Sequence, residues 1–346
     1  MSFGIVGAPQ SGKSSLFALL MAGESARRGR HDNEAVIPIP DERLQWLAEL
    51  HQPKKVTHAT LEFVDLGADP RHAGEDLAHL LNIQELRVCE GIVLVLDCFS
   101  GTASAENELD EFELATAVCD LQLVENRLER LVADRKRGNK EAEKEMALME
   151  KLKAHLEASR PLRVLQLSAS EQGMMRGYQF LSLKPVLVVA NLSEEDAGQE
   201  SPARLKEACA RAGHELCALS AALEAEIASL SESERGEFMR ELGIERPAIE
   251  RFLRSCYKSL GLISFLTAGK DECRAWSVSK GSTAPQAAGK IHSDLQRGFI
   301  RAEVVAFEEL KKHGSEKAAK AAGVYRLEGK DYLVQDGDVM EIRFSV

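Results

Sequence analysis

Residues 7–14 read GAPQSGKS. It fits the pattern G-x-x-x-x-G-K-[ST] of the phosphate-binding P-loop. The four residues before it, FGIV at 3–6, are typical of a short buried strand, and SLFALLM at 15–21 is typical of an apolar helix start. A strand, a glycine-rich loop and a helix in this order surround a phosphate with backbone N–H groups. The stretch therefore predicts binding of a nucleoside triphosphate.

Three side chains have predicted roles in this chemistry. Lys13 is placed to reach the β- and γ-phosphates, and the Ser14 hydroxyl is placed to ligate Mg²⁺. Asp65 ends the apolar run 61–65, where a P-loop protein carries an acidic group that holds Mg²⁺ directly or through water. A strand-end Asp can also cap a helix. We predict Lys13 and Asp65 as catalytic residues, and Ser14 and Asp65 as metal ligands.

Composition limits the classes of function. The chain has 346 residues, of which 44% are hydrophobic, so it is a globular protein rather than a disordered one. A net charge of −11 argues against indiscriminate coating of nucleic acid, and we expect no binding to DNA. Seven scattered Cys without a C-x-x-C pair indicate reduced thiols and a cytoplasmic location. No apolar run is as long as a membrane span, so no membrane partner is expected.

Several apolar runs predict a mostly parallel sheet. The runs at 61–65, 92–97 and 186–191 each end in a polar residue, as expected for strands buried on both faces. Ligands of open α/β sheets bind outside such strand ends. Residues 217–221 are a plausible further strand. The fold class is therefore α/β, with a P-loop NTPase domain formed by residues 1–105 and 181–262.

A helical insertion interrupts this domain. Apolar residues recur every three or four positions from 114 to 131 and again from 142 to 156, on either side of a polar break at 134–140. The spacing predicts a helical hairpin with coiled-coil-like packing that turns at 138–139, within an insertion at 106–180. The basic tip could contact RNA or could be a solvated loop.

The end of the chain has the pattern of a small β-rich domain. We predict strands at 274–278, 300–305, 332–334 and 339–344, and DGD at 336–338 indicates a hairpin turn between the last two. The predicted third domain covers residues 263–346.

Motifs along nearly the whole chain carry a family resemblance. They are GIVGAPQSGKSS at 4–15, PIPDERL at 38–44, EFVD at 62–65, FLSLKP at 180–185, ANLSE at 190–194, SAALEAE at 220–226, APQAAGKIHSD at 284–294 and GFIRA at 298–302. The chain resembles the YchF/Obg-like ATPase family of translation-factor-related P-loop proteins. The resemblance implies an ATP-preferring hydrolase with a coiled-coil insertion and a C-terminal TGS domain of the ubiquitin-like β-grasp fold. It also implies contact with the ribosome or ribosomal RNA.

The base-recognition segment favours adenine. GTPases carry N-K-x-D at this place, where the Asp carboxylate accepts hydrogen bonds from guanine, whereas residues 191–194 read NLSE. A longer carboxylate cannot hold the same bidentate geometry, and a hydrogen-bonding site rejects a base that it does not pair. The resemblance implies adenine recognition by Asn191, Leu192 and Glu194. With ATP and Mg²⁺ as cofactors, the predicted nucleotide-binding residues are Gln10, Ser11, Gly12, Lys13, Ser14, Ser15, Asn191, Leu192, Glu194, Ser220 and Ala221.

The sequence departs from the family pattern around the γ-phosphate. The family usually has Asn-Val where Gln10 and Ser11 stand, and the segment between Met21 and Val36 is short and contains no Thr. DLGA at 65–68 replaces D-x-x-G, and the loop after residues 98–99 lacks the family's His. We therefore expect slow ATP hydrolysis by a ribosome-associated switch. The alternative is a catalytically degenerate paralogue that acts as a scaffold through its TGS and helical domains.

Overall fold

A computed structural model describes residues 1–23, 26–29, 31–66, 81, 84–101, 104–136, 141–175, 177–197 and 201–345. Contacts divide the chain into two compact units. The nucleotide-binding unit comprises residues 1–35 and 62–249, and the C-terminal unit comprises residues 36–61 and 250–346. Each unit contains its own sheet and its own hydrophobic core.

The sheet of the nucleotide-binding unit has seven strands in the order β2-β3-β5-β1-β6-β7-β8. These are β1 (Ser2–Val6), β2 (Arg27–Arg28), β3 (Glu34–Pro38), β5 (Thr60–Asp65), β6 (Gly91–Asp97), β7 (Val186–Asn191) and β8 (Glu215–Leu219). β1 pairs in parallel with β5 and β6, β6 with β7, and β7 with β8. The predicted parallel sheet is confirmed. The last strand ends two residues earlier than predicted because Ser220 caps the next helix.

The nucleotide-binding unit also contains eight helices within the described residues. They are α1 (Lys13–Ala22), α4 (Gln84–Val88), α5 (Ala105–Lys136), α6 (Glu141–Glu157), α7 (Ala169–Met175), α8 (Ala203–Ala212), α9 (Ala221–Ser229) and α10 (Glu232–Glu241), with single 3-10 turns η2 (Leu162–Val164) and η3 (Leu181–Leu183). One hydrophobic cluster joins β1, β6 and β7 to α4, α5 and α8, so these three helices share a face of the sheet. α1 packs against α9.

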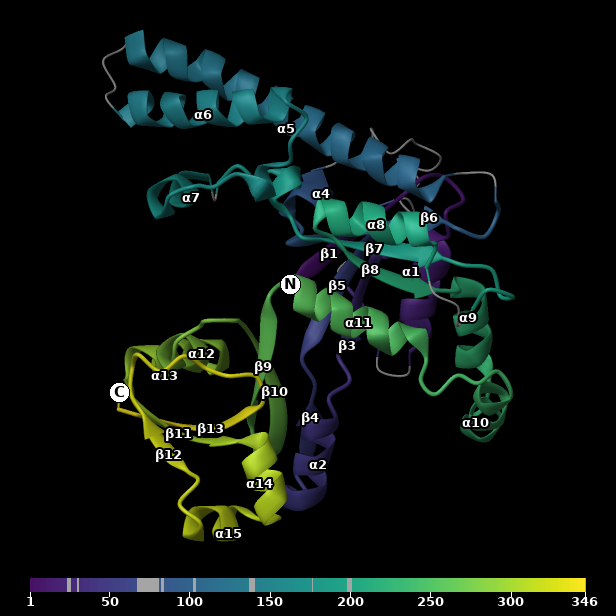
Figure 1. The fold of residues 1–346 in the computed structure, drawn as a ribbon. Helices are drawn as coiled ribbons and strands as arrows, with labels where there is room; N and C mark the ends of the chain where they lie inside the picture. Colours follow the sequence, from purple (N-terminus) through teal and green to yellow (C-terminus); the bar gives the residue numbers. More distant parts are fainter. Residues whose placement is uncertain are drawn as a thin grey trace. The chain divides into compact units, whose positions relative to one another are not determined.

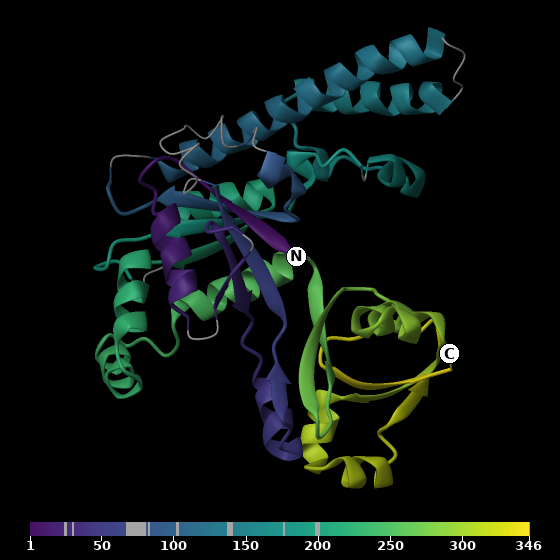
Figure 2. The ribbon, with the colours of Figure 1, turned by 180° about the vertical axis from the view of Figure 1, so that it is seen from behind.

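The predicted helical hairpin is confirmed. α5 and α6 lie side by side in both views of the chain (Figures 1 and 2), and residues such as Val124, Met149 and Leu152 fill the space between them. An ion pair of Arg127 with Glu145, at 2.7 Å, links the two helices at the surface. The predicted turn at 138–139 lies outside the described residues.

A buried carboxylate ties this hairpin to the sheet. Asp120 of α5 accepts hydrogen bonds from the backbone N–H groups of Leu181 and Ser182 at 2.9 and 2.8 Å. Both donors lie in η3, which leads directly into β7. The contact therefore fixes the start of the strand that ends at Asn191.

The C-terminal unit contains a six-stranded sheet in the order β12-β11-β13-β9-β10-β4. Its strands are β4 (Lys55–Thr57), β9 (Leu262–Thr267), β10 (Glu272–Ser279), β11 (Phe299–Ala306), β12 (Arg326–Glu328) and β13 (Asp338–Phe344). Its helices are α2 (Glu42–His51), α11 (Ala248–Ser259), α12 (Ala284–Ile291), α13 (Ser293–Arg297), α14 (Phe307–His313) and α15 (Glu316–Ala321).

Successive side chains of these strands enter two different cores. Phe265 and Val304 pack with α12, whereas the next residues along their strands, Leu266 and Val305, pack with α2 and α14. This alternation follows from the period of two in a β-strand. The sheet is therefore covered by helices on both faces, in keeping with the predicted β-grasp domain.

Part of the strand prediction at the C-terminus was wrong. Residues 332–334 belong to none of the strands given above, and Leu333 forms only an isolated bridge with Thr283. The Asp338 carboxylate accepts hydrogen bonds from the Tyr332 hydroxyl and the Gln335 N–H, so the segment is bonded to the start of β13 through a side chain. Gly337, at φ 85°, makes the predicted turn, but the turn leads from a loop into β13.

The observed units also group residues 36–61 with the C-terminal segment, because β4 pairs with β10 and α2 contributes Leu44 and Leu47 to the core. The division into 1–105 with 181–262, 106–180 and 263–346 remains a proposal. Within the described ranges, no helix combines the length and the apolar character needed to cross a membrane.

Candidate functional site

The P-loop connects β1 to α1 in the predicted manner. Gly7 and Gly12 adopt φ angles of 152° and 98°, which L side chains rarely reach. A Cβ on Gly7 would lie 2.2 Å from the Val95 carbonyl oxygen, and one on Gly12 would lie 2.2 Å from Asn191 Nδ2. Both glycines are therefore required by the loop. Gln10, also at positive φ, is exposed at its tip.

The start of α1 suits an anion. Gly12 caps the helix without a side-chain hydrogen bond, and its first turn contains no acidic residue. The N–H groups of this turn have no carbonyl partner within the helix, and the helix dipole adds partial positive charge there. These features fit a bound phosphate. Ser14 and Ser15 are exposed in the same turn, and Ser11 is buried in the loop.

Lys13 lies across the loop. Its Nζ donates hydrogen bonds to the carbonyl oxygens of Gly7 and Ala8, at 2.9 and 2.7 Å. Burial lowers the pKa of the Lys13 ammonium, although the charges of Asp65 and Glu108 oppose this shift. The structure thus places two carboxylates close enough to act on this ammonium.

Asp65 is fully buried at the end of β5. The parallel register aligns it with Ile5, two residues before the P-loop begins. Asn33 holds its backbone from the other side, because Asp65 N donates to Asn33 O at 2.9 Å. The buried Asp65 carboxylate and the exposed Ser14 hydroxyl are oxygen ligands of the kind that Mg²⁺ prefers, and their role as metal ligands remains a prediction.

Asn191 brings the predicted base-recognition segment to the P-loop. Its Nδ2 donates to the Ser11 carbonyl oxygen, and its Oδ1 accepts from Ala221 N, both at 3.0 Å. Leu192 N donates to Leu219 O, and Ser220 caps α9 by accepting a hydrogen bond from Leu223 N. Glu194 is exposed at the end of this segment. The structure therefore joins residues 191–192 and 220–221 to the loop.

Two acidic residues near the loop were not predicted as site residues. Asp97 ends β6 and accepts hydrogen bonds from the N–H groups of Phe99 and Ser100, each at 3.0 Å. Burial raises its pKa, but these bonds and one from the Ser100 hydroxyl outweigh burial and lower it. Glu108 lies in the first turn of α5. Burial and the charges of Asp97 and Glu111 raise the pKa of Glu108, while Lys13 opposes them. An acid in the first turn after β6 was the only sequence signal for Glu108.

Part of the predicted γ-phosphate region lies outside the described residues. This part includes Gly67 and residues 69–74, among them His72. In the segment between β2 and β3, Gly29 N donates a hydrogen bond to Glu34 O at 2.8 Å. The described residues contain no group of three or more His, Cys, Asp or Glu side chains arranged to hold a metal.

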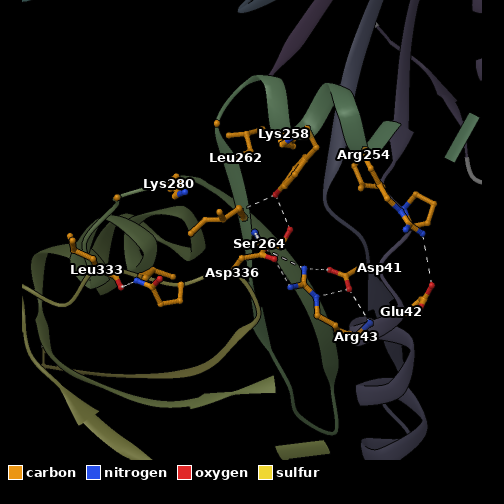
Figure 3. A pocket seen from close by; sticks show the side chains of 18 residues that line it. Asp41, Glu42, Arg43, Arg254, Lys258, Leu262, Ser264, Lys280, Leu333 and Asp336 are labelled. Atoms are coloured by element: carbon orange, nitrogen blue, oxygen red, sulfur yellow. Dashed lines mark hydrogen bonds and ion pairs between the residues drawn. The ribbon is translucent and has the colours of Figure 1, made fainter. Parts of the chain in front are cut away.

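The C-terminal unit has a separate pocket of about 1080 Å³ (Figure 3). On its wall, Arg43 points between Asp41 and Asp336, donating to both carboxylates at 2.8 Å. The other oxygen of Asp336 accepts a hydrogen bond from Ser264 N. Through Arg43 and Asp336, these hydrogen bonds connect the PIPDERL motif at the start of α2 to β9 and to the turn before β13. Lys280 also lines this pocket.

Comparison with known proteins decides the family. The chain is 41% identical over 362 residues to the ribosome-binding ATPase YchF of Escherichia coli O157:H7, with 99% of each chain covered. The chain belongs to the YchF family. The YchF protein of Bacillus subtilis strain 168 is 38% identical over the full length of both chains. Obg-like ATPase 1 of Oryza sativa subsp. japonica is 35% identical, covering all of this chain and 92% of its own.

A solved YchF structure supports the same assignment. The YchF GTPase of Schizosaccharomyces pombe superposes with a TM-score of 0.88 at 28% identity, covering 99% of this chain and 97% of its own. Residues 262–345 match the family YchF-GTPase_C, described as a protein of unknown function (DUF933). The fold is therefore the α/β P-loop fold of YchF proteins, with the helical hairpin and the C-terminal β-grasp domain.

Proposed function

We propose that this protein binds ATP with Mg²⁺ at its P-loop, hydrolyses it slowly and acts as a nucleotide-dependent switch on the ribosome in the cytoplasm. The observation that carries the proposal is the placement of Asn191. Its side chain joins the P-loop backbone to the segment 191–194 that differs from N-K-x-D. One nucleotide could therefore contact both elements.

The phosphates would be held by the loop and by the start of α1. The N–H groups of residues 10–15 supply neutral donors, and Lys13 supplies a positive charge for the β- and γ-phosphates. Ser14 and Asp65 would hold Mg²⁺, directly or through water. The bound ion would neutralise charge on the phosphate oxygens.

The base would be chosen by the segment after β7. Asn191, Leu192 and Glu194 form one edge of this region, with Ser220 and Ala221 beside them. Guanine presents donors that an Asp at the place of Glu194 would accept. Unpaired donors of a buried base are costly, so ATP should be preferred over GTP.

Hydrolysis would proceed by in-line attack of water on the γ-phosphorus, as the bond to the leaving ADP oxygen breaks. Lys13 and the loop N–H groups would stabilise the charge that moves toward the leaving group. The described residues between 26 and 35 contain no Thr that could complete the Mg²⁺ shell. Slow turnover follows from this missing ligand.

The ribosome is proposed as the partner on two grounds. The bacterial relatives are named ribosome-binding ATPases. Residues 263–346 carry 13 basic and 12 acidic residues, whereas the whole chain has a net charge of −11. Residues 263–346 are thus less acidic than the rest of the chain, and this segment is the better candidate for contact with ribosomal RNA.

Competition for binding tests the nucleotide assignment. A fluorescent ATP analogue, bound in the presence of Mg²⁺, is displaced by ATP and by GTP in parallel titrations. We expect the concentration of ATP needed for displacement to be at least about tenfold lower than that of GTP, because guanine is left unpaired. Lys13→Ala should abolish tight binding in a folded protein. Equal displacement by GTP refutes the ATP preference, and unchanged affinity of a folded Lys13→Ala protein refutes the P-loop assignment.

A further inference from the structure

Glu108 carries a buried carboxylate oxygen with unused bonding capacity. Its Oε2 is inaccessible to solvent and has no hydrogen-bond partner among the described residues. The side chain as a whole is only half-buried, so the carboxylate lies at the boundary between the protein and solvent. An unpartnered buried acceptor costs free energy, and in native structures it often marks a functional group.

The position of Glu108 relates it to the nucleotide. Ala105 and Leu109, on either side of it in α5, belong to the same core cluster as Val6, the last residue of β1 before the P-loop. The charge of Glu108 raises the pKa of Lys13, and the charge of Lys13 lowers the pKa of Glu108. The Glu108 carboxylate is therefore within electrostatic range of the P-loop ammonium.

The neighbouring carboxylates are already engaged. Asp97 accepts hydrogen bonds from two backbone N–H groups and from the Ser100 hydroxyl. Glu106, in the same turn of α5 as Glu108, accepts a hydrogen bond from the Ser104 hydroxyl at 2.7 Å, and its pKa is lowered. The two acids of this turn thus have pKa shifts of opposite sign, and Glu108 is the one with the raised value.

We propose that Glu108 is a catalytic residue of ATP hydrolysis, the general base for the attacking water. Its carboxylate accepts a hydrogen bond from the water and takes one proton as the water oxygen bonds to the γ-phosphorus. The bond between the γ-phosphorus and the bridging oxygen breaks, and ADP leaves with the electron pair. The proton is then released from Glu108 to solvent. This role rests on the proposed ATPase function.

The chemistry of the site supports this role. A general base works best when its pKa is close to the working pH, and burial together with Asp97 and Glu111 moves Glu108 in that direction. Lys13 opposes the shift and keeps the carboxylate available in its charged form. Glu108 is also a like charge to the triphosphate, so it should oppose nucleotide binding slightly while promoting turnover.

The test compares three variants of the full-length protein. Glu108→Gln should lower the single-turnover rate of ATP hydrolysis by about a hundredfold or more, the usual contribution of a positioned base. Its affinity for Mg·ATP should be unchanged or higher, because a negative charge has been removed. Glu108→Asp keeps the charge and should retain part of the rate. Glu129→Gln, an equal change at an exposed position further along α5, should behave like the wild type.

The outcomes separate the two proposals. A Glu108→Gln rate within about twofold of the wild type would overturn the role of Glu108, as would parallel losses of rate and affinity. If Glu108→Gln does not fold, as judged by thermal unfolding, Glu108→Ala is measured in its place, and a rate within about twofold of the wild type overturns the role. A wild-type protein that releases no phosphate from ATP overturns both the proposed ATPase function and the role of Glu108.

Discussion

Asn191 joins two backbone segments through one side chain. Its amide nitrogen donates to the Ser11 carbonyl oxygen and its amide oxygen accepts from Ala221 N, both at 3.0 Å. The side chain is 6% exposed, so these two bonds are made away from water. The contact is close enough that a Cβ on Gly12 would collide with Asn191. The P-loop is therefore braced against the end of β7.

This brace predicts that Asn191→Ala weakens nucleotide binding without removing any charge. Loss of two buried hydrogen bonds should cost about 2 kcal/mol, a fall in ATP affinity of about thirtyfold. Titration calorimetry with Mg·ATP measures the change. Ser193→Ala is the matched control, because the Ser193 hydroxyl bonds to the nearby Asp196 and, among the described residues, joins no second segment. Equal affinities of both variants would contradict the brace.

A second prediction concerns Arg43 in the C-terminal unit. Arg43→Ala would leave the Asp41 carboxylate, which is only 10% exposed, without its guanidinium partner. Such a loss should lower the free energy of unfolding of this unit by about 3 kcal/mol. Both Trp residues, Trp46 and Trp276, lie in this unit, so fluorescence during urea unfolding reports on it directly.

Arg254→Ala is the control for this experiment. Arg254 lines the same pocket but is 49% exposed, and it contacts Glu250 and Glu42 at 3.5 and 3.9 Å. An exposed pair of this kind should contribute less than about 1 kcal/mol. If both Arg variants shift the urea midpoint equally, the Arg43 contacts do not hold the unit together.

The sequence predicted the elements whose pattern is local. The P-loop glycines, the buried strands that end at Asp65 and Asn191, and the two helices of the hairpin each carry a signal within a short stretch. The predicted fold class is confirmed for this reason. The roles assigned to the site residues, in contrast, remain predictions.

Elements that depend on distant partners were not predictable. β4 is only three residues long, and it becomes a strand by pairing with β10, more than two hundred residues later. Tyr332 lies in a stretch with a strand pattern. In the structure its hydroxyl donates a hydrogen bond to Asp338, and the stretch forms only an isolated bridge at Leu333. No sequence motif marks Glu108. Its proposed role follows from the burial of one carboxylate oxygen and from the effect of the Lys13 charge on its pKa. Both depend on the folded structure.

A third prediction concerns binding to the ribosome. Four basic side chains around the motif 284–302 are exposed: Lys280, Lys290, Arg297 and Arg301. Lys280, Lys290 and Arg301 form no ion pair within the described part of the chain. Changing all four to Ala should weaken co-sedimentation with ribosomes and flatten its dependence on salt, because fewer phosphates are neutralised.

The control for this test is a second fourfold variant of equal charge. Lys311, Lys312, Lys317 and Lys330 are also exposed in the C-terminal unit. Point variants are preferable to deletion of the C-terminal segment, since deletion would strip α2 and β4 of their partners. Equal pelleting of both variants and the wild type at two salt concentrations would place the RNA-facing surface elsewhere.

The most direct test of the central claim is phosphate release by the wild-type protein with Mg²⁺ and either ATP or GTP. We predict Mg²⁺-dependent release from ATP, at a rate well below the enzyme median of about 10 s⁻¹ because the Mg²⁺ shell lacks a Thr. The value of kcat/KM for GTP should be at least about tenfold lower than the value for ATP, since guanine donors stay unpaired. Equal or faster release from GTP, or no release from either nucleotide, would contradict the account.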